Sequence, residues 1–190
     1  MADLSIDKRR TALVVIDLQK GIVSNPALKP RSSSEVVGNA VRLIDSFHRH
    51  EMTVFLVRVV RDKETALKVI SDETFSRPEP PPDWAEFAPG ITPNSSDIII
   101  SKRQWGAFYG TELELQLRRR GIDTIVLLGI STDYGVESTA RFAYEYGFQQ
   151  IFVEDAMASM SDEQHHRTVN YIFKRMGRVR STADVLSSLD

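Results

Sequence analysis

Three places in the sequence put chemically useful groups at or near the ends of apolar segments. Asp17 ends an apolar, mostly β-branched run at 11–16, Lys102 follows an apolar run at 97–100, and a polar turn at 131–135 follows a third run. A buried acid can transfer protons, and an ammonium group can hold an anion. A turn that opens a helix points backbone N–H groups at a negatively charged ligand. We therefore take Asp17, Lys102 and this turn as the candidate site.

Asp17 and Lys102 are expected to lie close together. In an open parallel sheet, ligands gather beyond the carboxyl ends of the strands, near the point where the strand order reverses. A carboxylate that ends a fully apolar strand is costly to desolvate unless a positive group pairs with it, and a lysine at a neighbouring strand end is the natural partner. The residue types alone leave open whether this ion pair is structural or catalytic.

The elements that must position these groups follow from the apolar pattern. Short runs rich in branched apolar residues are typical of strands that are buried on both faces, as in a parallel sheet. We predict strands at 11–17, 52–60, 97–100, 123–128 and 148–153.

Helical patterns separate the predicted strands. Ser32 offers a helix start before apolar residues with helical spacing at 36–47, and the segments 111–114 and 161–164 have the pattern of capping boxes. Strands that alternate with helices form βαβ units. We expect an α/β protein with a three-layer α/β/α Rossmann-like fold, a mostly parallel sheet of five or six strands, and a single domain over residues 1–190.

The segment 61–96 interrupts this alternation because it is rich in proline. Proline on this scale forbids a regular helix or a central strand through the middle of the segment. Long irregular connections are often lids or loops that contact a partner. An ordered surface wrap is the other interpretation, and the sequence leaves both open.

The composition excludes several classes of function. The chain has 190 residues, 42% hydrophobic and 26% charged, with a net charge of −2, so no broad electrostatic attraction to nucleic acid or to an anionic membrane is expected. We interpret the arginines at 118–120 as a solvated helix end. There is no cysteine, which excludes disulfides and thiolate chemistry. No signal peptide or membrane span is predicted, so we expect a cytoplasmic protein.

The three candidate places carry a family resemblance. Residues 17–19, Lys102, and the segments 129–132 and 136–141 resemble, in order and spacing, the motif blocks of the isochorismatase-like cysteine hydrolases. The resemblance covers the chain from about 11 to 189. Residues 102–111 are similar to those of the YecD-type branch, which also places glycine where the family has its nucleophilic cysteine.

The resemblance implies a role for each matching residue. Asp17 and Lys102 match the acidic and basic members of the active site, and the Ile130–Ser131 bond matches a cis peptide of the family. The backbone N–H groups of Ser131 and Gly135 match the pair that stabilises an oxyanion. Gly135 itself matches the nucleophile position, and a glycine cannot attack a carbonyl.

The resemblance also suggests which reaction remains without a thiol. The isochorismatase branch is similar in having glycine at this position, and it cleaves a vinyl ether with a proton donor and water. We hypothesise that Asp17 protonates the vinyl methylene carbon, and that Lys102 orients Asp17 or holds a substrate carboxylate. We expect the following residues to contact the substrate: Gln19, Arg58, Arg103, Trp105, Phe108 and Tyr134. The alternatives are that the arginines are solvated on the surface and that the aromatic residues pack in the core.

Two other functions stay open. The segment 136–141 looks more like the amidase branch, so the chain could be a non-catalytic ligand-binding or regulatory protein derived from a cysteine amidohydrolase. Serine hydrolysis through Ser131 or Ser138 is a second alternative, although the turn lacks the second glycine of a nucleophile elbow and no histidine is evidently placed as a base.

No metal or cofactor is expected. The pattern lacks a glycine-rich nucleotide loop, and we expect all four histidines to lie on the surface: His48, His50, His165 and His166. The expected partner is a small-molecule substrate. Exposed aromatics in the proline-rich segment, together with Tyr144, Tyr146 and Phe148, could support a homo-oligomer, either a dimer or a tetramer.

Overall fold

A six-stranded parallel sheet forms the centre of the protein. The computed structural model describes residues 4–61, 67, 69–72 and 79–190. Neighbouring strands follow the order β3-β2-β1-β4-β5-β6, and each pair is parallel. The predicted fold class is therefore confirmed, with the upper number of strands. The strands are β1 (Thr11–Ile16), β2 (Thr53–Val59), β3 (Ile98–Lys102), β4 (Thr124–Ile130), β5 (Gln149–Ala158) and β6 (Arg178–Arg180).

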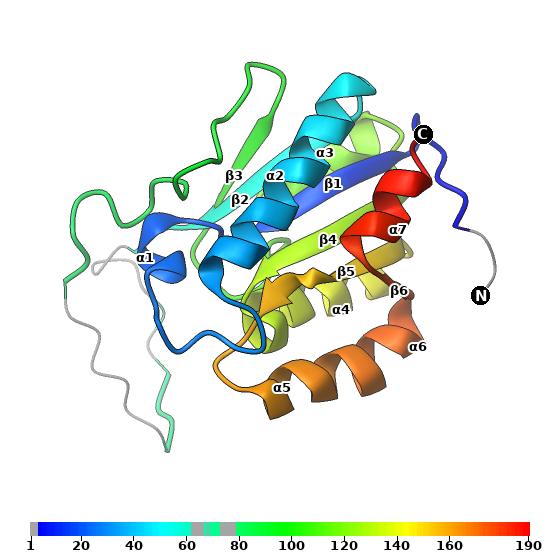
Figure 1. The fold of residues 1–190 in the computed structure, drawn as a ribbon. Helices are drawn as coiled ribbons and strands as arrows, with labels where there is room; N and C mark the ends of the chain where they lie inside the picture. Colours follow the sequence, from blue (N-terminus) through cyan, green and yellow to red (C-terminus); the bar gives the residue numbers. More distant parts are fainter. Residues whose placement is uncertain (1–3, 62–66, 68, 73–78) are drawn as a thin grey trace.

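Helices cover both faces of this sheet (Figure 1). One core, which includes Leu13 and Leu43, joins the sheet to α2 and α7, and a second, which includes Phe55 and Leu113, joins it to α3, α4 and η2. The order of layers is thus helix, sheet, helix. The helices are α1 (Lys20–Val23), α2 (Ser33–Arg49), α3 (Leu113–Arg119), α4 (Glu137–Glu145), α5 (Asp162–Arg167), α6 (Lys174–Met176) and α7 (Thr182–Ser187), with π-helical turns η1 (Thr132–Val136) and η2 (Thr168–Phe173).

The helix starts follow the predicted caps in two of three cases. Ser32 forms a complete capping box at the start of α2, and the Ser161 side chain accepts a hydrogen bond from the Gln164 N–H at the start of α5. The box predicted at 111–114 is wrong, because α3 begins at Leu113. The Thr111 hydroxyl instead donates to the Ala107 carbonyl and accepts from the Leu113 N–H.

The strand ends differ from the predictions in ways that matter for the site. β3 runs to Lys102, so this lysine is the last residue of its strand. β4 continues to Ile130, which places Ser131 directly after it. β5 extends to Ala158 and contains a bulge. Leu127 pairs with Phe152 and Gly129 pairs with Met157, so β5 advances by five residues between two pairs where β4 advances by two. The short strand β6 was missed because its charged sequence carries no strand pattern.

The bulge in β5 fastens two helices on one face of the sheet. The Asp155 carboxylate accepts hydrogen bonds from the Thr182 N–H at 2.6 Å and from its hydroxyl at 2.7 Å, at the start of α7. The Asp155 carbonyl accepts from the Asn39 side chain of α2. The bulge therefore frees the Asp155 carbonyl, which in a regular strand would bind a neighbouring strand, to bind a helix instead.

The proline-rich segment is an ordered wrap where the structure describes it. Residues 79–96 contain no helix or strand, as expected, while residues 62–66, 68 and 73–78 lie outside the described part. Trp84 is buried rather than exposed, contrary to the expectation of an aromatic interface, because its indole packs on Gly21 of α1. The Arg61 guanidinium lies 4.1 Å from the centre of the same ring system. Phe148 is also buried, whereas Tyr144 and Tyr146 are exposed.

Gly129 allows β4 to approach β1 unusually closely. It has a φ of +129°, and a Cβ at this position would lie 2.0 Å from the Ile16 carbonyl oxygen. Asp17 follows Ile16, and the turn at 131–135 follows β4, so this contact brings two parts of the candidate site together. Only a glycine satisfies both the backbone angle and the distance.

Replacement of Gly129 by alanine is therefore expected to lower the free energy of unfolding by more than about 2 kcal/mol, because it adds backbone strain and a steric overlap. Gly38→Ala in α2 is the matched control, since no atom lies within 4 Å of the added methyl group. It should raise stability by about 0.5–1 kcal/mol. Urea unfolding of the two variants measures both values, and equal stability of Gly129→Ala and the parent would contradict the argument.

Candidate active site

The Asp17 carboxylate and the Lys102 ammonium form a buried ion pair. Lys102 Nζ donates to Asp17 Oδ2 at 2.7 Å. Asp17 is 5% exposed and Lys102 is 2% exposed. β2 lies between their strands, so the two side chains and their hydrogen bond together span the roughly 10 Å between strands that are not adjacent. The predicted meeting of these residues is thus observed, and it requires a long cationic side chain at position 102.

The backbone and the surroundings of Asp17 are unusual for an acid. Its φ is +54°, which few residues other than glycine adopt, and its N–H donates to the Val57 carbonyl at 2.9 Å. Burial raises the pKa of Asp17 to about 6, and the nearby Lys102 charge opposes this rise only in part. Among the described residues, Asp17 Oδ1 has no hydrogen-bond partner. A proton can therefore reside on this carboxyl near neutral pH.

Lys102 makes a second contact that reaches beyond Asp17. Its ammonium also donates to the Gln104 carbonyl at 3.1 Å. The lysine thus connects the acid to the residues that follow β3, and it has two acceptors for its three N–H groups. In the part of the chain that the structure describes, no acceptor for the third N–H is found.

Gly135 lies beside the acid. The peptide bond between Ile130 and Ser131 is cis, and the chain then enters η1, which contains Gly135. A Cβ on Gly135 would lie 3.1 Å from Asp17 Oδ2 and 3.5 Å from the Trp105 carbonyl oxygen. The missing side chain therefore leaves the carboxyl group uncrowded on this side. Ile130 itself is a core residue, and its side chain does not contribute a polar group.

The segment after β3 covers the Gly135 turn. Trp105 presents its carbonyl to Gly135, and its indole ring meets Tyr134 edge to face at 4.8 Å between centroids. Trp105 is 58% exposed, so the pair forms an aromatic surface next to the buried acid. Of the predicted substrate-contacting residues, these two are therefore the ones placed beside Gly135.

Other predicted contact residues have different positions. The Gln19 amide donates to the Val59 and Trp84 carbonyls and accepts from the Val59 N–H, so it holds β2 and the wrap together and is not free for substrate. Phe108 is 6% exposed and packs against Tyr146 and Phe148 in the core, which makes it a structural residue. Both corrections have one cause, because the sequence shows a residue's type but not what surrounds it.

The two predicted arginines lie near the carboxyl edge on separate strand ends. Arg58 of β2 is half-buried, and its Nε donates to the Ser101 hydroxyl at 3.2 Å. Its guanidinium lies 6.0 Å from the Phe87 ring centre. Arg103 is exposed directly after Lys102. Their role in holding a substrate anion stays a prediction.

The expectation that all histidines lie on the surface is wrong for His165. His165 is fully buried, with Nδ1 2.9 Å from the Thr132 hydroxyl, and burial lowers its pKa to about 4. His48 pairs with Asp97 at 2.7 Å. His165 lies four residues before Val169 on the apolar face of its helix, and this spacing could have revealed its burial.

Sequence reasoning also missed polar residues that organise the turn. Ser131 and Ser159 both donate their hydroxyl groups to Asp133 Oδ1, which joins the ends of β4 and β5. Thr139, one helical turn after Gly135, is fully buried and bonds to the Gly135 carbonyl. Helical spacing from Gly135 was the only signal available for Thr139.

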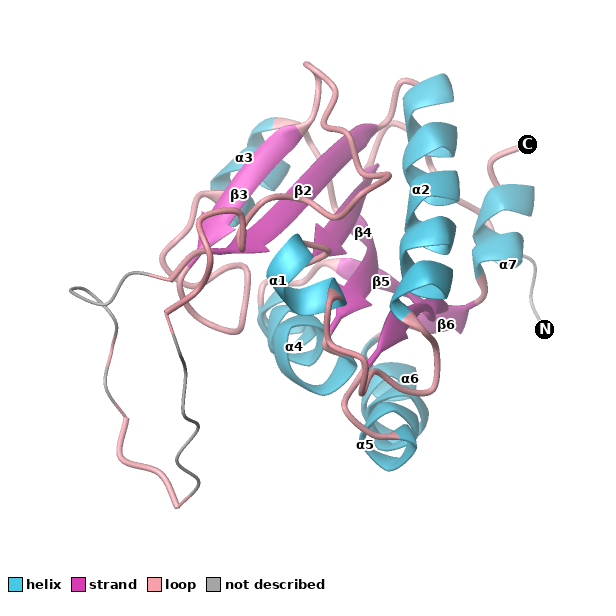
Figure 2. Ribbon diagram, turned by 60° about the vertical axis from the view of Figure 1, so that its left-hand side comes forward, coloured by secondary structure: helices cyan, strands magenta, loops and turns pink. Residues whose placement is uncertain are grey.

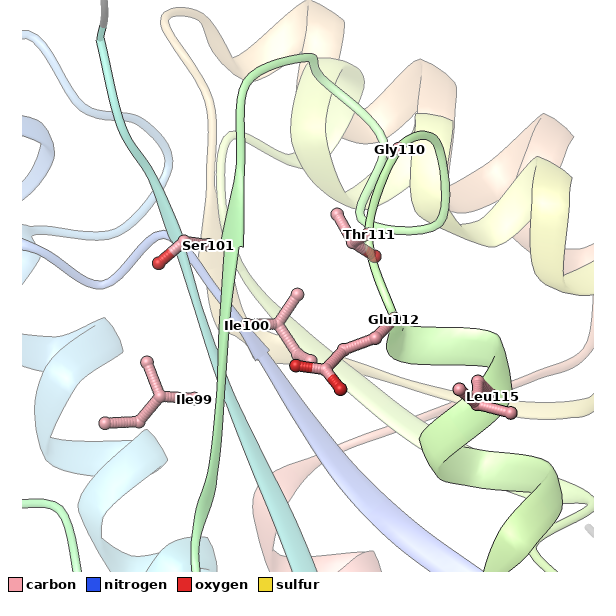
Figure 3. A pocket seen from close by; sticks show the side chains of 7 residues that line it. All are labelled: Ile99, Ile100, Ser101, Gly110, Thr111, Glu112 and Leu115. Atoms are coloured by element: carbon pink, nitrogen blue, oxygen red, sulfur yellow. The ribbon is translucent and has the colours of Figure 1, made fainter.

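Open hollows on the surface lie away from Asp17. Figure 3 shows one of about 540 Å³ between the free edge of β3 and the start of α3, with Ile99, Thr111 and Glu112 among its lining residues. A second, of about 400 Å³, lies beside Trp84 and α1, and Figure 2 shows α1 near the arrowheads of the strands. Neither is lined by Asp17 or Lys102, and the low exposure of these two residues shows that the ion pair is covered.

The described residues contain no group of three histidine or carboxylate side chains placed to hold a metal ion. Within the same part of the chain, no helix is long and apolar enough to cross a membrane.

Comparisons with known proteins place this site in a family. The model of the isochorismatase domain matches residues 11–184. The isochorismatase family protein YwoC of Bacillus subtilis is 50% identical, and the match covers 100% of this chain and 99% of YwoC. The isochorismatase family protein YecD of Escherichia coli O157:H7 is also 50% identical, and the match covers 98% of this chain and 100% of YecD. The chain belongs to the isochorismatase family.

A solved structure and a more distant relative agree with this assignment. The structure of an isochorismatase family protein from Burkholderia thailandensis has a TM-score of 0.93 and 40% identity, and the match covers 99% of both chains. A probable isochorismatase from Pseudomonas chlororaphis is 27% identical over 98% of this chain and 89% of its own. The fold thus belongs to a family whose members are hydrolases.

A double-mutant cycle is expected to show strong coupling within the ion pair. Asp17→Asn or Lys102→Met alone leaves one buried polar or charged group without its partner, and each should lower the free energy of unfolding by about 3 kcal/mol or more. The double variant should lose less than the sum of the two, because neither charge remains. Urea unfolding at pH 8 measures the cycle. Simple additivity would show that the two groups do not interact in solution.

Proposed function

We propose that this chain hydrolyses an isochorismate-like vinyl ether by acid catalysis and without a cysteine nucleophile. The observation that carries the proposal is the Asp17 carboxyl group, which is buried, has a pKa raised to about 6, and faces a glycine where a Cβ would lie 3.1 Å away. The chain has no cysteine, and we infer that Gly135 occupies the family's nucleophile position. A proton donor and water are then the remaining reagents.

In the proposed reaction, Asp17 donates its proton to the methylene carbon of the vinyl ether. The resulting oxocarbenium ion accepts a water molecule, which returns a proton to Asp17 and leaves a hemiketal. The hemiketal then breaks its carbon–oxygen bond to give pyruvate and a dihydroxy-diene acid. One water is consumed and no redox change occurs. A carboxyl group with a pKa near the working pH is suited to both proton transfers.

Lys102 is proposed to control the charge of this acid. In the free protein its ammonium divides between Asp17 and the Gln104 carbonyl. A substrate carboxylate that attracts the ammonium would weaken its hold on Asp17, and the pKa of the acid would rise further. Substrate binding would thus favour the protonated form that the reaction needs.

Further substrate contacts are proposed for an aromatic pair, two backbone N–H groups and two arginines. Trp105 and Tyr134 lie beside Gly135 and provide an apolar wall for a ring. The N–H groups of Ser131 and Gly135 are proposed to stabilise developing negative charge, and Arg58 and Arg103 to attract a second carboxylate. Self-association and a cytoplasmic location also remain predictions.

Turnover of isochorismate tests the proposed function. The purified protein should release pyruvate, and Asp17→Asn should reduce kcat by about 10²–10⁴-fold, because the amide cannot donate the proton. Asp123→Asn is the control, since Asp123 pairs with Arg10 on the surface. The value of kcat/KM should be greatest below about pH 6 and fall about tenfold per pH unit above it, because the acid form of the free protein is lost as the pH rises through the pKa of Asp17.

A coupled pyruvate assay between pH 5 and 9 measures both effects. Activity that persists in Asp17→Asn, or that increases with pH across this range, would remove Asp17 as the acid.

The second candidate function is ligand binding without catalysis, in a pocket derived from a cysteine amidohydrolase. It is favoured by the cover over the ion pair and by the amidase-like segment 136–141. The two candidates differ in what a side chain at position 135 should do. For the vinyl-ether hydrolase a Cβ crowds Asp17, whereas for the derived amidase a thiol restores a lost nucleophile.

Gly135→Cys separates the candidates, with Gly135→Ala as the matched control for the added Cβ. If the protein is an isochorismatase, both variants should lower vinyl-ether turnover at least tenfold, because the carboxyl group must shift by a few tenths of an ångström. A panel of vinyl ethers and small amides provides the readout. Gain of amidase activity by Gly135→Cys, with a parent protein inert on every compound, would refute the isochorismatase proposal.

A further inference from the structure

A single buried hydroxyl links the segment after β3 to the Gly135 turn. Thr139 Oγ1 donates to the Gly135 carbonyl at 2.7 Å and accepts from the Ala107 N–H at 3.0 Å. The bond to Gly135 alone is ordinary, because threonine in a helix often bonds to the carbonyl four residues earlier. The bond from Ala107 is not local, since it spans 32 residues of sequence.

Ala107 is held on both sides of its backbone. Its N–H is taken by Thr139 of α4, and its carbonyl accepts from the Thr111 hydroxyl at 2.5 Å. Ala107 and Thr139 are both fully buried, so no water can replace the threonine hydroxyl. Loss of that hydroxyl leaves a buried N–H without a partner, which is costly.

The residues just before Ala107 cover the proposed reaction centre. The Gln104 carbonyl accepts from the Lys102 ammonium, and the Trp105 carbonyl faces Gly135. Gly106 lies against α4, where a Cβ would be 3.5 Å from the Ser138 side chain. The cover is therefore attached through Gln104 to Lys102 and through Ala107 to Thr139 and Thr111.

We propose that Thr139 is a positioning residue: its hydroxyl fixes the cover, residues 103–107, against the Gly135 turn and so sets the space above the Asp17 carboxyl group. The expected effect of Thr139 on turnover rests on the proposed function, whereas its effect on the position of the cover does not. Substrate that attracts Lys102 away from Gln104 releases the attachment at Gln104, while Thr139 and Thr111 still hold Ala107. The cover then pivots at Ala107 and keeps the Trp105 wall in register with Gly135.

Hydrogen exchange of the cover tests the proposal without any substrate. Thr139→Val removes the hydroxyl at nearly constant shape, and it should increase the exchange rate of amides in 103–107 about tenfold or more, the factor that corresponds to the loss of one buried hydrogen bond. Thr139→Ser keeps the hydroxyl and should stay within about threefold of the parent. Thr139→Ala serves as a second hydroxyl deletion if the valine variant does not fold.

The matched control is Thr168→Val. Thr168 of η2 is also buried, and its hydroxyl donates at 2.7 Å to Glu137 of α4, the helix that carries Thr139. None of its side-chain hydrogen bonds reaches the cover. This variant should leave exchange in 103–107 unchanged. Equal acceleration in the Thr139 and Thr168 variants would show general loosening of α4 and would overturn the positioning role.

Kinetics on isochorismate provide the second readout. Thr139→Val should raise KM several-fold more than it lowers kcat, with the pH profile of Asp17 unchanged, and Thr139→Ser should restore both. If the parent protein turns over isochorismate and Thr139→Val is kinetically normal, the proposal is wrong. If the parent is inert, the proposed function fails, and the exchange experiment alone decides the role of Thr139.

Discussion

The site depends on one interaction, the attraction between a buried carboxylate and a buried ammonium that come from strands separated by a third. Each charge alone would be costly in the apolar interior, and together they are tolerated because Lys102 reaches Asp17 across the end of β2. The balance is incomplete, since burial still raises the pKa of Asp17. Because the compensation is incomplete, the carboxyl group can hold a proton near pH 6, which the proposed acid catalysis requires.

The sheet supports this interaction through backbone contacts rather than through side chains. Gly129 lets the end of β4 lie against Ile16, and Asp17 follows with a backbone angle that its N–H bond to Val57 helps to hold. The turn that follows β4 then delivers Gly135 to the open side of the carboxyl group. These backbone contacts determine where position 135 lies relative to the acid, and they do not depend on the side chain at that position.

Much of this arrangement could be predicted from the sequence because parallel strands bring their carboxyl ends to one edge. The pairing of Asp17 with Lys102 followed from that rule together with the cost of an unpaired buried charge. The structure departs from prediction where a side chain serves the backbone instead of the ligand. Gln19 and Thr111 are examples, since their polar groups bind nearby main-chain atoms that no pattern of residue types reveals. His165 was misjudged because its polarity was given more weight than its place on an apolar helical face.

The bulge in β5 has a consequence for how the protein tolerates change. Because β5 shifts its register midway, its first half is aligned by the sheet and its second half by the end of β4 and by the bridge between Lys29 and Ser159. Substitutions in the first half of β5 are therefore expected to affect its pairing with β4 and β6 more than the position of its carboxyl end, because the irregular residues between Phe152 and Met157 separate the two halves.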